Sequence, residues 1–294
     1  MKQGDKRVVV LAGGISSRMK VPLADPKQAV DAELLKQADE RAKGMIGVGA
    51  GGRPFLDYLF YNIREAGLDD VVVVISEHDN ALRQYYGMRD RDNPFHGLRI
   101  SYAIQRIPSG RGKPLGTADA LVKALSLRED WRGGDFIVCN SDNLYSTHAY
   151  NLLLECEAKN ALIDYDRSGL EFDEQRIAQF GITFKDADGY LLEILEKPPP
   201  DQLNRLRGSD GSLRVSMNIF RLNYDMVLPF LRECPLHPVR QEKELVVAVT
   251  NMVKANPRSL KVLPLREHVP DLTYKEDIAS VREYLRRHFA ELDW

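Results

Sequence analysis

The chain of 294 residues has little of what marks a secreted or membrane-spanning protein. Its three cysteines, Cys139, Cys156 and Cys234, are widely spaced, so we expect neither a disulfide framework nor a zinc site. No apolar run approaches the roughly 20 residues that cross a bilayer. The polar segment 1–7 also lacks the apolar region of a signal peptide. These absences predict a cytoplasmic protein.

An excess of charge of one sign is also missing. The 41 Lys and Arg residues nearly balance the 43 Asp and Glu residues, and the formal net charge is −2. No overall field therefore draws nucleic acid or an anionic membrane to the surface, and we expect neither as a partner. The six histidines show no paired metal-ligand spacing, and no serine–histidine triad motif is visible. Any anion-binding site must be local.

Short apolar runs alternate with helical patterns in the first half of the chain. This alternation predicts parallel strands joined by right-handed crossovers, with helices on both faces of the sheet. The expected strands are 8–12, 71–75, 98–104 and 136–139, and the expected helices are 54–66 and 117–125. Thr117 is expected to cap the second of these helices.

The second half has a more mixed pattern. We expect a hairpin from 181–184 and 190–195, further strands at 215–222 and 260–265, and helices at 224–231, 242–255 and 275–292. Nothing divides the chain, so we predict one α/β domain over 1–294 with a mixed, mostly parallel sheet. Residues 1–145 and 146–294 are its two halves, and the motifs described next predict that the first binds a nucleotide and the second an acceptor. Segment 20–42 interrupts the first crossover, and it is either an active-site lid or a solvated insertion.

The glycine loop after the first strand is the most informative stretch. Gly13 and Gly14 follow the apolar run directly, where ligands bind in open α/β sheets, and glycine lets the backbone approach a ligand closely. Arg18 adds a guanidinium suited to phosphate. The dinucleotide motif is excluded because Ile15 stands where glycine is needed, and the Walker motif is absent. These residues favour a triphosphate cradle over a plain tight turn.

Leu11-Ala12-Gly13-Gly14, followed by Ser-Ser-Arg-Met, resembles the opening signature of the nucleotidylyltransferase superfamily, which includes the sugar-1-phosphate pyrophosphorylases. That signature continues with a lysine and a glycine-bearing stretch that ends in a basic residue and proline, similar to Arg53-Pro54. Lys43 matches the lysine by its spacing to Pro54, and Lys27 is the rival because segment 20–42 intervenes. The resemblance implies a single Rossmann-like domain of the GT-A type.

Later motifs follow in the order of the family. On the nucleotide side, Gln105 ends a strand, and Gly116-Thr117 is similar to the start of the family's Gly-Thr-Ala helix. An amide offers a base edge both a donor and an acceptor. The resemblance implies that these residues seat the nucleotide together with Leu11, Ala12, Gly13 and Gly14.

Two aspartates resemble the metal ligands of the family. Asp142 follows a buried central strand, where a carboxylate can hold Mg²⁺ against phosphate oxygens, and Asp271 precedes a Glu-Asp pair as in the family's second metal motif. The acceptor motifs come next. Glu196-Lys197 resembles the family's Glu-Lys-Pro, and the resemblance implies that Glu196, Lys197, Asn143 and Asn218 bind the sugar phosphate.

The resemblance implies Mg²⁺-dependent in-line transfer of a nucleoside monophosphate from an NTP to a sugar-1-phosphate. Arg18, Lys43 and Lys197 would be its catalytic cations. Two alternatives stay open: a non-sugar acceptor such as phosphocholine, and a non-catalytic relative that senses nucleotide sugars. The sequence leaves open the base and the sugar, and it is compatible with a homo-oligomer.

Overall fold

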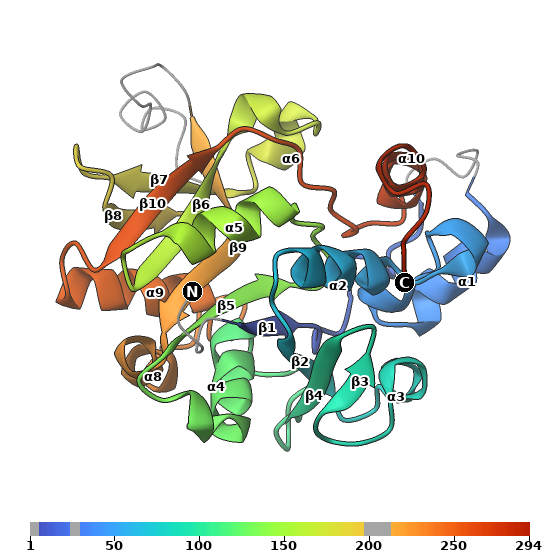
Figure 1. Cartoon of the computed structure of the whole chain (residues 1–294), viewed down its shortest axis with the longest axis horizontal. Helices are drawn as coiled ribbons and strands as arrows, with labels where there is room; N and C mark the ends of the chain where they lie inside the picture. The colour runs from blue at the N-terminus through green and yellow to red at the C-terminus, as the bar shows by residue number, and fades with distance from the viewer. Residues whose placement is uncertain (1–5, 24–29, 197–212) are drawn as a thin grey trace.

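A ten-stranded mixed sheet forms the centre of the protein, and the computed structural model describes residues 6–23, 30–196 and 213–294 (Figure 1). The main path through the sheet runs β10-β6-β9-β5-β1-β2-β4-β3, and β7 pairs with β8 and β9 beside it. The strands are β1 (Arg7–Leu11), β2 (Asp70–Ser76), β3 (Asn93–Phe95), β4 (Leu98–Gln105), β5 (Asp135–Asn140), β6 (Asn160–Asp166), β7 (Gly181–Lys185), β8 (Leu191–Leu195), β9 (Arg214–Asn223) and β10 (Leu260–Leu265).

The strands of the first half are parallel and those of the second half are mixed. β1 pairs in parallel with both β2 and β5, and β2 pairs in parallel with β4. β9 runs antiparallel between β5 and β6, while β10 is again parallel to β6. Because parallel strands end at the same edge, the carboxyl ends of β1, β4 and β5 lie together. The predicted mixed, mostly parallel sheet is confirmed.

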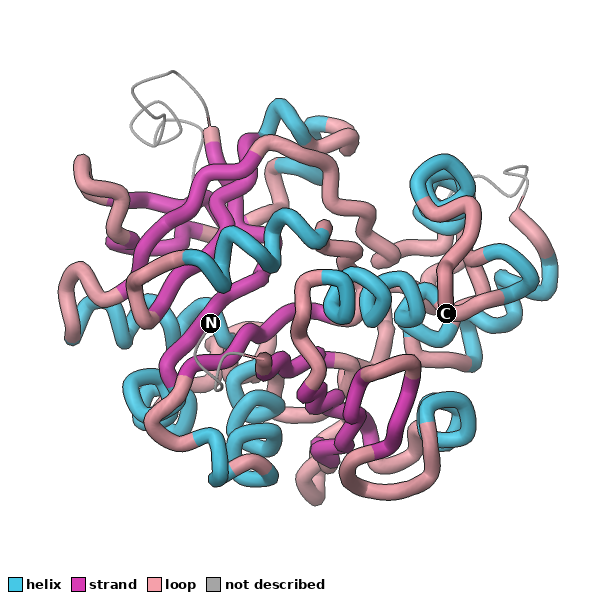
Figure 2. The backbone as a smooth tube through the Cα atoms, in the orientation of Figure 1, coloured by secondary structure: helices cyan, strands magenta, loops and turns pink. Residues whose placement is uncertain are grey.

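Helices cover both faces of the sheet (Figure 2). Alternate side chains of β1 explain this, since Val8 and Val10 pack into one core and Val9 into the other. The first core takes α1 (Ala32–Glu40), α2 (Phe55–Glu65), α3 (Asn80–Tyr86), α5 (Thr147–Glu155), the short α6 (Glu174–Ile177) and α10 (Asp277–His288). The second takes α4 (Thr117–Leu127), α8 (Tyr224–Arg232) and α9 (Leu245–Ala255). Within the described ranges, none of the helices has the length and apolar character that a bilayer crossing needs.

Strand β6 was not expected from the sequence. It is buried along almost its whole length, yet Asp164 and Asp166 interrupt the apolar run that would have indicated it. Asp164 is fully buried because Thr183 and Lys185 of β7 donate to its carboxylate. Buried charge is tolerated where it is paired and hydrogen-bonded. The groups that pair with Asp164 come from a segment distant in the sequence, so the local pattern could not indicate this strand.

Segment 20–42 is partly anchored to the body of the protein. Leu34 and Ala38 of α1 are buried in the first core, and Asp39 pairs with Lys275 at 2.6 Å. The amide oxygen of Gln37 accepts from the Gly47 backbone N–H at 2.9 Å. Helix α1 therefore packs against the segment that follows Lys43 and against the approach to α10.

The expected capping of α4 by Thr117 is wrong. Gly116 is the N-cap residue, and the Thr117 hydroxyl instead accepts from the Leu245 backbone N–H at 2.9 Å. Gly116 has φ 104°, and a Cβ there would lie 2.6 Å from the carbonyl oxygen of Lys243. Glycine is required at this position by both the backbone conformation and the close approach of the chain before α9.

Gly116→Ala should lower the free energy of unfolding by about 3 kcal/mol, because it adds a clash with backbone to an unfavourable φ. Gly67→Ala is the matched control, since Gly67 has φ 80° and no atom within 4 Å of an added Cβ. It should cost about 1 kcal/mol. Urea unfolding curves measure both values, and equal losses in the two variants would show that the Lys243 contact is unimportant.

Candidate active site

A cleft of about 290 Å³ lies at the carboxyl ends of β1, β4 and β5. The glycine loop forms one wall, and the Ala12 backbone N–H donates to Val74 at 2.9 Å, which continues the sheet into the loop. A Cβ on Gly13 would lie 3.3 Å from the side-chain oxygen of Gln105. The cleft brings together most of the predicted nucleotide-side residues: Leu11, Ala12, Gly13, Gly14, Arg18, Lys43, Gln105, Gly116, Thr117 and Asp142.

Lys43 and Asp142 form an ion pair inside this cleft. The Lys43 Nζ lies 2.8 Å from Oδ2 of Asp142, and their side chains are 11% and 20% exposed. Asp142 follows β5, whereas Lys43 begins a short 3₁₀ turn at Lys43–Met45. The structure thus places Lys43 beside Asp142. The rival, Lys27, lies outside the described residues.

Asp271 lies next to Asp142 because the two backbone segments pair. An isolated antiparallel bridge joins Asn143 to Asp271, and the Leu272 backbone N–H donates to the Asp142 carbonyl at 2.8 Å. Asp271 is 7% exposed, and its Oδ1 accepts from the Thr273 hydroxyl at 2.5 Å. Two carboxylates from distant parts of the sequence therefore meet at the end of the central sheet.

The two carboxyl groups have opposite pKa shifts. Burial raises the pKa of Asp142, but the Lys43 ammonium and the Arg18 guanidinium outweigh it and hold the pKa below the ordinary value of 3.8. For Asp271, burial and then the charge of Asp142 raise the pKa above 3.8, against the opposing effect of Arg176. The raised pKa of Asp271 thus reflects first its burial and then the repulsion by the neighbouring Asp142 carboxylate.

The oxygen donors of these two residues are of the kind that a divalent cation prefers. Mg²⁺ prefers oxygen ligands and is held by one or two carboxylates while substrate phosphates and water complete its shell. Lys43 contacts Asp142 at Oδ2 alone. In the part of the chain that the structure describes, no cluster of three or more His, Cys, Asp or Glu side chains could hold a metal, so a closed structural metal site is not found there.

Gln105 has its amide donors engaged within the protein. Its Nε2 donates to the Gly116 carbonyl and to Asp119, both at 2.9 Å. Because both of these partners are acceptors, the network fixes the orientation of the amide and leaves its oxygen facing Gly13. Gln105 thus presents an acceptor to the cleft, where the sequence suggested both a donor and an acceptor.

The predicted acceptor-side residues are less closely grouped. Asn143 is 5% exposed, and its Oδ1 lies 3.4 Å from the Tyr145 hydroxyl, which donates its single proton to the Met217 carbonyl at 2.7 Å. Asn218 has φ 59° in the middle of β9, whose pairing with β6 shifts register nearby. Such left-handed residues in strands often accompany functional sites.

The Glu-Lys motif lies at the end of β8, and Lys197 falls outside the described residues. Glu196 is paired with Arg240, which also contacts Glu244 at 3.0 Å. A sugar hydroxyl at Glu196 would therefore compete with an arginine.

Arg176 is a charged residue of this region that the sequence did not indicate. It comes from α6, lies 3.0 Å from Asp271 and also pairs with Asp277. No motif surrounds it, and its partners are distant in the sequence, so no local pattern could have revealed it.

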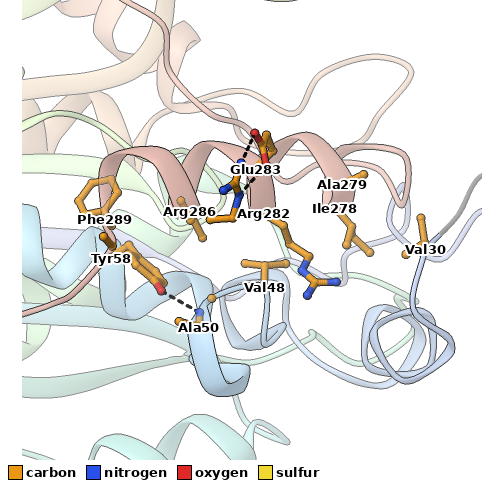
Figure 3. A pocket seen from close by; sticks show the side chains of 13 residues that line it. Val30, Val48, Ala50, Tyr58, Ile278, Ala279, Arg282, Glu283, Arg286 and Phe289 are labelled. Atoms are coloured by element: carbon orange, nitrogen blue, oxygen red, sulfur yellow. Dashed lines mark hydrogen bonds and ion pairs between the residues drawn. The ribbon is translucent and has the colours of Figure 1, made fainter.

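A larger cavity of about 600 Å³ lies elsewhere, between α10 and the start of α2 (Figure 3). Tyr58 and Phe289 form one end of it, and Arg282 extends from α10 toward Val48. Among its described lining residues are none of the predicted site residues. The predicted nucleotide-side residues therefore line the smaller, charged and glycine-rich cleft and not the larger cavity.

Comparison with known proteins identifies the class to which this sheet and cleft belong. The family model of the nucleotidyl transferases matches residues 38–286, most of the chain but not the glycine loop. The chain belongs to the nucleotidyl transferase family, and it is a nucleotidyltransferase. The resemblance seen in the sequence is confirmed.

Three characterised proteins are similar to this chain in sequence. The UTP–glucose-1-phosphate uridylyltransferase AglF of Haloferax volcanii is 26% identical over 67% of this chain and 68% of its own length. The small subunit of wheat (Triticum aestivum) glucose-1-phosphate adenylyltransferase is 24% identical over 76% of this chain and 47% of its own. The bifunctional protein GlmU of Symbiobacterium thermophilum is 30% identical over 47% and 22%. The chain thus spans less than half of the last two.

Solved structures show the same fold. HddC from Yersinia pseudotuberculosis has a TM-score of 0.61 at 18% identity, covering 96% of this chain and 100% of its own. A structure described as a glucose-1-phosphate thymidylyltransferase from Bacillus anthracis has a TM-score of 0.63 at 18% identity, covering 95% of both chains. At this identity the likeness concerns the fold alone.

Lys43→Met should raise the pKa of Asp142, because burial stays while the nearest positive charge is lost. In the native protein this pair stabilises the fold above the ordinary pKa of 3.8, and its contribution is lost as the pH falls through the lower folded-state value. A ¹³C NMR titration of the carboxyl groups measures the change. Lys113→Met, which removes another cleft lysine, paired with Glu242 at 2.7 Å, should leave this pKa unchanged. A rise in both variants would point to a general field instead of the ion pair.

Proposed function

We propose that this nucleotidyltransferase transfers a nucleoside monophosphate from an NTP to a sugar-1-phosphate and releases pyrophosphate. The observation that carries the proposal is the meeting of Asp142, Asp271 and Lys43 beside the glycine loop. An amide acceptor on Gln105 and the turn at Gly116 also line this cleft, where a base would lie. The names of the uridylyl- and adenylyltransferase relatives support a sugar-1-phosphate as the acceptor.

The reaction is an in-line displacement at the α-phosphorus of the NTP. An oxygen of the sugar phosphate forms the new bond, the bond to the β-phosphate oxygen breaks, and its electron pair leaves on pyrophosphate. A phosphate monoester is already an anion near neutral pH, so no general base is needed. Catalysis then consists of positioning the two substrates and neutralising charge.

The cations of the cleft stabilise the departing pyrophosphate. Arg18 offers a planar fork that matches phosphate oxygens, and Lys43 offers a compact charge. Asp142 holds Lys43 at 2.8 Å, so its ammonium is positioned in the cleft. We assign the sugar side to Glu196, Lys197, Asn143 and Asn218.

Asp142 and Asp271 would hold Mg²⁺, which when bound neutralises phosphate charge. Their oxygen donors suit this ion, and its positive charge would offset their mutual repulsion. The cytoplasmic location and assembly into a homo-oligomer stay predictions of the sequence.

Asp142→Asn should lower pyrophosphate release by about 10²- to 10³-fold, in the range seen when one charge-stabilising group is removed from an active site. The substitution keeps the shape of the side chain and removes its charge. Asp135→Asn is the matched control, because Asp135 starts the same strand at the opposite edge of the sheet and pairs with Arg221 at 2.9 Å. It should retain full activity per folded molecule. Undiminished turnover in Asp142→Asn would contradict the assignment of Asp142 as a metal ligand.

The substrate assignment is tested by a matrix of five NTPs against common sugar-1-phosphates, followed as pyrophosphate release with Mg²⁺. Release with at least one sugar-1-phosphate is expected. Phosphocholine is included as a non-sugar acceptor, and turnover with it alone would change the acceptor class. Release with no pair would contradict the proposed activity and favour a nucleotide-sugar sensor.

A further inference from the structure

Asp271 already has a cation, and that cation is an arginine of the protein itself. A guanidinium nitrogen of Arg176 lies 3.0 Å from Oδ2 of Asp271, and the other oxygen of Asp271 accepts from Thr273. The Arg176 and Asp271 side chains are only 16% and 8% exposed. Both oxygens of this proposed metal ligand are therefore engaged within the protein and shielded from solvent.

The position of Arg176 is fixed by several partners. Its guanidinium also pairs with Asp277, whose carboxylate accepts from the Thr273 and Tyr274 backbone N–H groups at 2.8 and 2.6 Å. The loop that carries Asp271 is thus attached to the start of α10, and Arg176 joins both. Because two carboxylates bind its guanidinium, Arg176 is held more firmly than a side chain in a single exposed ion pair.

Aromatic rings complete this arrangement. The Arg176 guanidinium lies over the rings of Phe172 and Tyr274, with its carbon 4.7 and 5.3 Å from their centroids. The guanidinium carbon of Arg18, in the glycine loop, also lies over the Tyr274 ring, 5.8 Å from its centroid. One tyrosine therefore contacts both the arginine on Asp271 and the arginine proposed to bind phosphate, and cation–π attraction favours each contact.

A divalent cation at Oδ2 of Asp271 would lie close to the Arg176 guanidinium, and the two positive charges would repel each other. Asp142 is less restricted, because Lys43 contacts only one of its oxygens. A nucleotide brings anionic oxygens that a displaced guanidinium can pair with, whereas a free cation brings none. The cost of displacing Arg176 is therefore highest when no nucleotide is bound.

We propose that Arg176 is a built-in counter-ion of Asp271 that competes with divalent cations and keeps the free enzyme from binding them tightly. The idea rests on the proposed function, because it takes Asp142 and Asp271 as the metal ligands. Arg176 is a positioning residue in this scheme, acting on Asp271. Tyr274 and Phe172 hold it there.

The test is a titration of the full-length chain with Mn²⁺ and no nucleotide, with free Mn²⁺ followed by its EPR signal. Arg176→Gln should tighten Mn²⁺ binding about tenfold, within the range usual for coupled sites. Arg176→Lys keeps a charge and should bind as weakly as the native chain. Adding Asp271→Asn to Arg176→Gln should abolish the gain.

Arg128→Gln is the matched control, because Arg128 pairs with the buried Asp70 away from the cleft. It should leave Mn²⁺ binding unchanged, which separates the effect from general destabilisation. If Arg176→Gln does not fold, Tyr274→Leu tests the same proposal. It keeps both ion pairs of Arg176 and removes one of the two aromatic rings that hold its guanidinium. It should tighten binding several-fold.

The Mn²⁺ titrations distinguish a failure of the proposed metal site from a failure of the counter-ion proposal. If Asp142→Asn and Asp271→Asn each leave Mn²⁺ binding unchanged, the metal site of the proposed function is wrong, and the counter-ion proposal is lost with it. If both weaken binding but neither Arg176→Gln nor Tyr274→Leu tightens it, the counter-ion proposal alone is overturned.

Discussion

Two carboxylates of like charge lie side by side at the end of the sheet, and the charged groups around them are arranged to offset this repulsion. Asp142 has Lys43 as its partner and Asp271 has Arg176. Repulsion of this kind is costly in a half-buried setting unless cations accompany it. With Arg18 and Asp277, the site holds three acidic and three basic groups, and their formal charges sum to zero.

Backbone pairing is what forces the carboxylates together. The bridge between Asn143 and Asp271 brings the loop before α10 against the end of β5, and the Leu272 bond to Asp142 reinforces it. A side chain alone could turn away from a like charge, but these residues sit on paired backbone. The site is therefore set by the course of the chain through the mixed sheet.

The sequence was informative where one local pattern sufficed. Continuous apolar runs revealed β1, β2 and β5, and the position of Asp142 followed from the end of a strand. Patterns failed where the deciding partner is distant. The burial of Asp164 depends on β7, and the place of Arg176 depends on Asp271 and Asp277. The cap of α4 was missed for the same reason, since the Thr117 hydroxyl is taken by the start of α9.

Segment 235–244 connects the turn at Gly116 with the end of β8. At one end of this connection, the backbone of Lys243 bonds to Leu115 and Ala118, on either side of Gly116. At the other, Arg240 holds Glu196 at the end of β8. A shift in this segment would move both the turn that we propose to face the base and the strand end that we propose to face the acceptor. Changes of nucleotide and acceptor preference during divergence are therefore expected to be linked here, because a replacement that alters one side also moves the other.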